Sequence, residues 1–290
     1  MITTDRLVKR YGDRTVLDHV DLRVEPGTVY GLVGPNGAGK TTILSLLAGL
    51  RTATEGSVSI AAEPREIAIL PDTPRLDPWL TGHEVVALAD SLVSDSDGNV
   101  EHVLEIAGLS RDASRQVGGY SRGMLQRLGM ACTVVGDPKV MLLDEPASAL
   151  DPQGRREMLD LIDHMKGRAT VLFSSHILAD VQQVCDTVGV LHQGRLLFQG
   201  TLDELLVGAA VPRYVVRVRP PLGDIVAGLD RLEWVTSVEV TGSNEIRVTV
   251  ASISDAESHL GGALAACGAR VVSTAPEAVS LERAFLELTS

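Results

Sequence analysis

The sequence GPNGAGKT, residues 34–41, decides how the rest of the chain is interpreted. It follows the apolar run VYGLV and opens KTTILSLLAGL, which has the apolar spacing of a helix and ends at Gly49. A glycine-rich turn between a strand and a helix aims backbone N–H groups at phosphate oxygens, and the helix N-terminus adds positive potential. The lysine of such a motif reaches the β- and γ-phosphates, and its last hydroxyl holds Mg²⁺. The sequence therefore predicts a phosphate-binding loop formed by Gly34, Pro35, Asn36, Gly37, Ala38, Gly39, Lys40, Thr41 and Thr42.

A second segment, VMLLDEP at residues 140–146, is an apolar strand that ends in two acids. Asp144 at the strand end is expected to accept Mg²⁺, and Glu145 to orient and polarise an attacking water. Acids commonly begin loops, so this pattern carries little weight alone. Paired with a phosphate-binding loop it predicts phosphoryl-transfer chemistry.

Strands and helices alternate over most of the chain, which predicts an α/β fold with a mainly parallel sheet. The pattern turns helical from about residue 80 to 135, and we expect an insertion there. After residue 209 the order of elements becomes βαββαβ, which is the ferredoxin-like pattern. We therefore expect one domain over 1–209 and a small α+β domain over 210–290 that ends in an amphipathic helix.

Composition narrows the classes of partner. The net charge is −12, which argues against a nucleic-acid partner and against docking on an anionic membrane. No apolar run approaches the roughly 18–20 residues that cross a bilayer, so direct lipid insertion is not expected. Three scattered cysteines have no metal-ligand spacing and indicate a reducing compartment. Any membrane association should therefore go through another protein.

A third segment, YSRGM at residues 120–124, shows which family the chain resembles. Alone it would be an ordinary helix start with Ser121 as the N-cap. Together with the two motifs above, it resembles the signature loop of the nucleotide-binding subunits of ATP-binding-cassette (ABC) transporters, a P-loop NTPase fold with an antiparallel β subdomain. The resemblance covers about residues 1–208 and implies ATP and Mg²⁺ as cofactors. It also implies a second ATPase chain in a homodimer, whose ATP this loop contacts through Ser121, Arg122, Gly123 and Met124.

Further site residues follow from the same resemblance. His176 in SSH matches the switch histidine that grips the γ-phosphate, although a lone histidine after a strand is usually structural. Ser148 and Asp151 in SALD match a loop at the dimer interface, but Asp151 could equally be the N-cap of the next helix. Tyr11 matches the aromatic residue that stacks on adenine, or it is a surface tyrosine next to a turn.

Two positions depart from the family pattern. The family has glycine where Arg122 stands, and we expect this side chain to point outward or toward phosphate. It has Gln or Glu where Asp72 stands, a residue that senses Mg²⁺ and water and links the site to the helical insertion. Asp keeps the oxygen ligand but is one methylene shorter, so direct metal contact and contact through water both stay open.

The ending SLERAFLELT, residues 280–289, is similar to that of daunorubicin-resistance-type exporter ATPases, although Arg283 and Ala284 differ from the usual residues. The resemblance implies an ATP-hydrolysing exporter subunit that works with a separately encoded membrane permease at the cytoplasmic face of the cell membrane. Its expected catalytic residues are Glu145, His176 and Lys40, and its metal ligands are Thr41, Asp72 and Asp144. The alternative is a soluble ABC ATPase that acts on a partner such as the ribosome, but such relatives carry tandem cassettes or long insertions.

Overall fold

The computed structural model describes residues 1–93, 99–208, 213–277 and 281–289. The chain divides into two compact units, one of Met1–Leu205 with the last residues from Leu288, the other of Leu206–Glu287. The domain boundary expected at 209–210 lies outside the described residues. No helix in the described part of the chain is long and apolar enough to cross a membrane.

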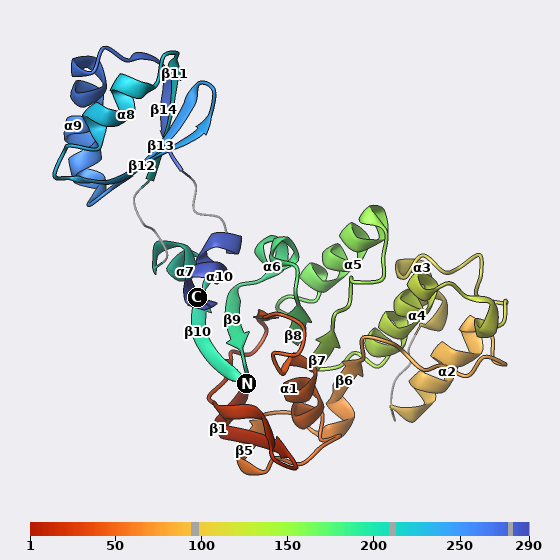
Figure 1. Cartoon of the computed structure of the whole chain (residues 1–290). Coiled ribbons are helices and arrows are strands. Elements are labelled where there is room, and N and C mark those ends of the chain that lie inside the picture. The colour runs from red at the N-terminus through yellow and green to blue at the C-terminus, as the bar shows by residue number, and fades with distance from the viewer. Residues whose placement is uncertain (94–98, 209–212, 278–280, 290) are drawn as a thin grey trace. The chain divides into compact units, whose positions relative to one another are not determined.

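A six-stranded sheet forms the centre of the first unit (Figure 1), with strand order β10-β9-β4-β8-β7-β6. All neighbouring strands are parallel except the pair β9 and β10. This arrangement confirms the expected mainly parallel sheet. Its strands are β4 (Val29–Val33), β6 (Ile67–Leu70), β7 (Val140–Asp144), β8 (Thr170–Ser175), β9 (Thr187–His192) and β10 (Arg195–Thr201).

A smaller antiparallel sheet belongs to the same unit, with β2, β3 and β5 all paired to β1. Its strands are β1 (Ile2–Tyr11), β2 (Arg14–Val20), β3 (Arg23–Val24) and β5 (Glu55–Ile60). One apolar cluster joins the two sheets across α1 (Lys40–Leu47), and it includes Leu17, Leu32, Ile43, Leu142 and Leu191. Helix α1 ends where Gly49 adopts a left-handed φ of 70°, a conformation that glycine adopts without steric cost.

Three helices form the block that the sequence predicts between residues 80 and 135, and Figure 1 shows them grouped at one end of the unit. They are α2 (Gly82–Leu92), α3 (Val100–Ile106) and α4 (Arg122–Val134). Their apolar faces share a cluster that includes Val86, Leu104 and Leu128. The block lies in the chain between β6 and β7, which are parallel neighbours, so the chain leaves the sheet at the carboxyl end of β6 and rejoins it at the opposite edge, where β7 begins.

Helices α5 (Pro152–His164) and α6 (Leu178–Val184) follow β7 and β8, and α7 (Leu202–Gly208) follows β10 and falls across the division between the units. Short 3₁₀ turns occupy Pro64–Glu66 and Val117–Gly119.

The second unit has the ferredoxin-like order that the sequence predicts. Its antiparallel sheet runs β12-β13-β11-β14, and its buried core includes Val216, Leu229 and Ile246. The elements are β11 (Arg213–Arg219), α8 (Gly223–Leu229), β12 (Val235–Gly242), β13 (Glu245–Val250), α9 (Ile253–Ala266) and β14 (Arg270–Pro276). The final helix, α10 (Leu281–Thr289), falls across the division between the units.

Candidate active site

The carboxyl ends of three parallel strands meet at one edge of the large sheet. Register pairs Val33 of β4 with Ser175 of β8, and Asp144 of β7 with Ser174 of β8. The segments that follow these strands are the phosphate loop, the acidic pair and the switch histidine. In open α/β sheets this edge is where ligands bind. Sheet register therefore brings together three motifs that are far apart in the sequence.

Backbone geometry of the phosphate loop requires glycine at two positions. Gly39, which precedes α1, has φ 112°, a conformation that residues with a Cβ rarely adopt. A Cβ on Gly34 would lie 2.2 Å from the Leu191 carbonyl oxygen. Lys40 is the first residue of α1, is 6% exposed, and donates from Nζ to the Gly34 carbonyl at 2.6 Å. The loop thus places one buried ammonium group over its own backbone.

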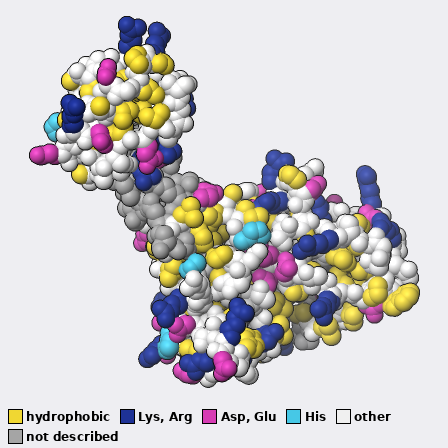
Figure 2. All heavy atoms as spheres, in the orientation of Figure 1, with side chains coloured by type: hydrophobic (Ala, Val, Ile, Leu, Met, Phe, Trp, Pro, Cys, Tyr) yellow, Lys and Arg dark blue, Asp and Glu magenta, His cyan; other side chains and the backbone are white. Residues whose placement is uncertain are grey.

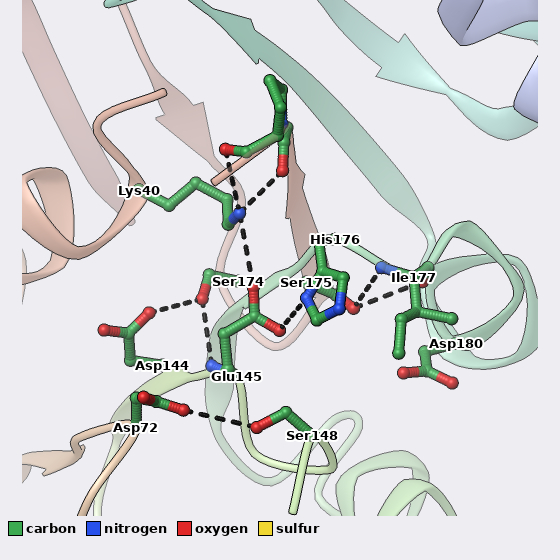
Figure 3. A network of polar contacts seen from close by, with 12 residues as sticks. Lys40, Asp72, Asp144, Glu145, Ser148, Ser174, Ser175, His176, Ile177 and Asp180 are labelled. Carbon is green, nitrogen blue, oxygen red and sulfur yellow. Dashed lines mark hydrogen bonds and ion pairs between the residues drawn. The ribbon is translucent and has the colours of Figure 1, made fainter. Parts of the chain in front are cut away.

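Glu145 lies between two of the residues expected to contact phosphate (Figure 3). Its Oε2 is 2.8 Å from His176 Nδ1, and its Oε1 is 3.3 Å from Lys40 Nζ. Oε1 is buried and has no hydrogen bond, so its contact with Lys40 is an ion pair without hydrogen-bond geometry. The backbone of Glu145 has a left-handed φ of 50°, which costs free energy in a residue with a Cβ and is typical of functional sites.

Ser174 holds both acids, although the sequence analysis gave it no role. Its hydroxyl donates to Asp144 Oδ1 at 2.6 Å and accepts from the Glu145 N–H at 3.0 Å. The side chain is fully buried at the end of β8. The only sequence signal was its place in SSH, and a serine at a strand end is too common to predict this contact.

Asp72 and Arg122, the two departures from the family pattern, contact each other. Arg122 Nη2 lies 3.7 Å from Asp72 Oδ1, and Ser148 Oγ donates to the same oxygen at 3.3 Å. The Arg122 side chain is 64% exposed, so it does point outward, but toward Asp72. Exposed pairs of this kind contribute little free energy. These contacts matter because of their position, since they connect the three separate segments that contain Asp72, Arg122 and Ser148.

A cavity of about 530 Å³ collects most of the predicted site residues. From those predictions its lining includes Pro35, Asn36, Gly37, Gly39, Lys40, Thr41, Thr42, Asp72, Arg122, Asp144, Glu145, Ser148 and His176. Arg14 and Val16 of β2 also line it, and the sequence analysis missed both. Gly34, Ala38 and Tyr11 are not part of its lining.

The signature loop lines a different cavity of about 550 Å³. Ser121, Gly123, Met124 and Asp151 line this cavity, and Arg122 lines both cavities. The capping roles considered for two of these residues are present: Ser121 accepts from Met124 N at 3.2 Å, and Asp151 accepts from Gly154 N at 2.9 Å. Thus the loop predicted to contact ATP does not reach the cavity of its own phosphate loop, apart from Arg122.

Tyr11 is 40% exposed and lies next to two cations. Lys9 Nζ is 4.9 Å and Arg51 Cζ 5.4 Å from the centre of its ring. These distances allow cation–π attraction, which holds the ring in place beside the cavity.

A paired charge joins the helices that follow the acidic pair and the switch histidine. Arg155 of α5 donates to both carboxylate oxygens of Asp180 of α6, at 2.6 and 2.8 Å. Hydrogen bonding to Asp180 raises the pKa of Arg155 above its ordinary value. The bidentate pair gives α5 and α6 a defined relative position.

Magnesium, which the phosphate loop implies, fits the oxygen donors at this edge of the sheet. Thr41 supplies a hydroxyl and Asp144 and Asp72 supply carboxylates around one cavity. In the described residues, no group of three or more His, Cys, Asp and Glu side chains could hold a metal. Mg²⁺ is commonly bound through one or two carboxylates plus substrate phosphates and water, so this donor set suits it.

Comparisons with known proteins show the family of the chain. The model of the ABC transporter family matches residues 17–148. The chain is 40% identical over 213 residues to the uncharacterized ABC transporter ATP-binding protein YxlF of Bacillus subtilis (strain 168), covering 71% of this chain and 72% of that one. It is 34% identical over 307 aligned positions to the daunorubicin resistance ATP-binding protein DrrA3 of Streptomyces coeruleorubidus, covering 99% and 95%.

A solved structure of the ATP-binding subunit of an ABC transporter matches with a TM-score of 0.67 and 31% identity, over 72% of this chain and 92% of that one. The fold is thus that of an ABC transporter ATP-binding subunit. Because one relative aligns with nearly the whole of this chain, the chain belongs to the family of ABC transporter ATP-binding proteins and is an ATPase.

Proposed function

We propose that the chain is the ATPase of an exporter, in which two copies close around two MgATP and drive a separately encoded permease at the cytoplasmic face of the membrane. The observation that carries this proposal is the division of the expected ATP contacts between two cavities of one chain. Ser121 and Gly123 can act on an ATP only if a second chain presents its phosphate loop to them. The similarity to a daunorubicin resistance protein supports export as the direction.

The chemical step is in-line attack of water on the γ-phosphorus, which breaks its bond to the β–γ bridging oxygen and releases ADP with that oxygen. Glu145 accepts the proton of that water. His176 donates through Nδ1–H to Glu145, which leaves Nε2 to face the γ-phosphate. Thr41 and Asp144, with Asp72 nearby, would hold a Mg²⁺ ion, which would supply positive charge against the phosphates.

Phosphate competes with Glu145 for Lys40. Lys40 Nζ lies near Oε1 of the Glu145 carboxylate and is expected to contact the γ-phosphate. An anion that draws Lys40 away frees this oxygen to meet the water, while His176 keeps its contact with the other oxygen. The carboxylate is therefore freed for catalysis when a triphosphate is in place.

A complementation experiment tests the shared site. Lys40→Ala should abolish the phosphate loop of one chain, and Ser121→Asn should disable the signature contact while keeping a residue that caps helices well. Neither variant alone should hydrolyse ATP. Their mixture should recover up to about one quarter of the normal rate, because half of the dimers are mixed and each has one intact site. A mixture as inactive as its parts would overturn the two-chain proposal.

We propose that the permease binds at the helical block. Leu88 and Leu92 lie one turn apart on α2 and are 53% and 77% exposed, and Trp79 before this helix is 78% exposed. Figure 2 shows hydrophobic side chains at the surface of this end of the unit. Exposed aromatic and aliphatic groups of this kind are typical anchors of protein interfaces.

The matching experiment is affinity purification of tagged Glu145→Gln chain from native membranes with MgATP. A polytopic permease at one copy per chain is expected, and adding Trp79→Ala with Leu92→Asp should remove it. Leu50→Asp is the control, since Leu50 is 67% exposed after α1, outside the helical block. Recovery of only soluble partners would contradict the exporter proposal.

A further inference from the structure

Arg14 lines the ATP cavity, although no motif assigns it a role. It is the first residue of β2, and it shares the lining of the cavity with Val16. Alternate residues of a strand point to the same face, so both side chains are directed to the cavity by the pleat of β2.

The hairpin between β1 and β2 places Arg14 next to the expected adenine platform. Tyr11 and Arg14 are direct cross-strand partners that flank the turn at Gly12 and Asp13. The side chains of directly opposed residues in an antiparallel pair lie on one face. A base stacked on Tyr11 would therefore have Arg14 beside it.

The same strand runs beside the phosphate loop. A Cβ on Gly39 would lie 3.2 Å from the Val16 carbonyl oxygen and 2.7 Å from Leu17 Cδ2, so β2 touches the last glycine of the loop. Arg14 is two residues, or about 7 Å, away along the strand. It therefore lies between Tyr11 and the loop.

The guanidinium group of Arg14 has no hydrogen bond or ion pair to another described residue. Nearby arginines of the same sheet do have partners: Arg10 pairs with Glu55 at 2.5 Å and Arg23 with Glu25 at 2.6 Å. In a chain of net charge −12, an arginine without a carboxylate partner beside a phosphate loop is available to an anion.

We propose that Arg14 binds the ribose and α-phosphate segment of the nucleotide, between the base and the part held by Lys40. A planar guanidinium suits phosphate oxygens, which it can contact with two N–H groups at once. Because this segment is common to ATP and ADP, Arg14 contributes to binding of both and does not act on the γ-phosphate. The inference rests on the nucleotide site described above and adds a residue that determines its affinity.

The experiment is calorimetric titration of the full chain with MgADP and with the non-hydrolysable ATP analogue MgAMP-PNP. Arg14→Gln should raise the Kd of both nucleotides by a similar factor, about tenfold, which is typical of losing a hydrogen bond to a charged group. The Kd values of Arg14→Lys should fall between those of Arg14→Gln and of the unmodified chain, because lysine keeps the charge but lacks the planar guanidinium group. In steady-state assays Arg14→Gln should raise KM and leave kcat unchanged. This pattern indicates loss of an interaction that is equally strong in the ground state and in the transition state.

Arg10→Gln is the matched control, since Arg10 is in the same hairpin and adjacent to Tyr11, on the opposite face. It removes the same charge and should leave both Kd values unchanged. Equal Kd values for Arg14→Gln and the unmodified chain would overturn the inference, and so would a loss confined to AMP-PNP. If the unmodified chain bound neither nucleotide, the ATP site itself would be wrong.

Discussion

At the scale of single residues, the candidate site depends on how few groups hold its two acids, Asp144 and Glu145. Asp144 is buried and Glu145 has a left-handed backbone, and one serine hydroxyl contacts both. A hydroxyl can donate one bond and accept others, so Ser174 satisfies a carboxylate oxygen and an N–H at the same time. Its loss would leave both groups buried without this partner.

Ser174→Ala should therefore reduce kcat by about tenfold or more and destabilise the fold by about 1–3 kcal/mol, the cost of unsatisfied buried groups. The Kd for MgADP should change less, because the phosphate loop is untouched. Steady-state ATPase assays and denaturant unfolding measure the two effects. Ser175→Ala is the control, since among the described residues the Ser175 hydroxyl bonds only to the backbone of Ile177. Identical behaviour of the two variants would remove Ser174 from this role.

Asp72 offers a second test at this scale. Asp72→Ala removes the acceptor of Ser148 and the partner of Arg122, but no contact of Lys40. Nucleotide affinity should therefore change by less than about threefold, since the exposed pair is weak, while ATPase activity coupled to the permease should be largely lost. Titration with MgADP and ATPase assays in reconstituted complexes measure both. An equal loss of both would contradict a coupling role.

At the scale of elements, the helix that begins the helical block has a capping box. The Thr81 hydroxyl accepts from Glu84 N at 3.2 Å, and Glu84 accepts from the Thr81 N–H at 2.8 Å. The Thr81 N–H and the Thr81 hydroxyl, which donates to the same carboxylate at 2.9 Å, lower the pKa of Glu84 below its ordinary 4.5. Two otherwise unpaired N–H groups at the start of α2 are thus satisfied by side chains.

Thr81→Ala should destabilise α2 by about 1 kcal/mol, seen as faster amide hydrogen exchange within that helix. Because folding lowers the pKa of Glu84, its ionised carboxylate stabilises the folded state. This stabilisation is fully present above pH 4.5, the pKa of the unfolded state, and is lost as pH falls through the lower pKa of the folded state. Glu84→Gln should lower the thermal midpoint at pH 7 and converge with the unmodified chain once the pH falls below the lowered pKa of Glu84 in the folded state. A pH-independent difference would contradict this account.

At the scale of the whole molecule, the chain has two units with separate hydrophobic cores, and the cavity lined by Lys40 and Glu145 lies in the first. A ligand stabilises the unit that binds it. Removing buried methyl groups destabilises the unit that contains them. The two kinds of change should therefore act on different parts of an unfolding curve.

Calorimetry should resolve two transitions. MgADP at a hundredfold excess over its Kd should stabilise only one of them, by about 2.7 kcal/mol. Leu229→Ala, at a fully buried position of α8, should destabilise only the other, by about 2–5 kcal/mol. A single transition that both changes shift equally would mean that the units unfold as one.

Much of this molecule could be predicted from the sequence because the signals are local. Such signals depend on residues close in the chain. They include the backbone conformation at glycine, capping by Ser121 and Asp151, and the alternation of strands with helices. The same holds for the βαββαβ order of the second unit, whose strand pairing follows from its element pattern. Motif spacing also predicted that Lys40, Asp144 and Glu145 would share one site.

Contacts between distant residues could not be predicted in this way. Ser174 contacts the two acids because of sheet register. Arg122 contacts Asp72, and Arg14 lines the same cavity as Lys40, because of where separate segments of the chain end. A strand periodicity states which face a residue occupies but not what lies opposite it. The sequence thus determined the family, the fold class and the chemistry of each motif. Only the tertiary structure decided the partners of individual side chains, because register and packing bring distant segments within bonding distance.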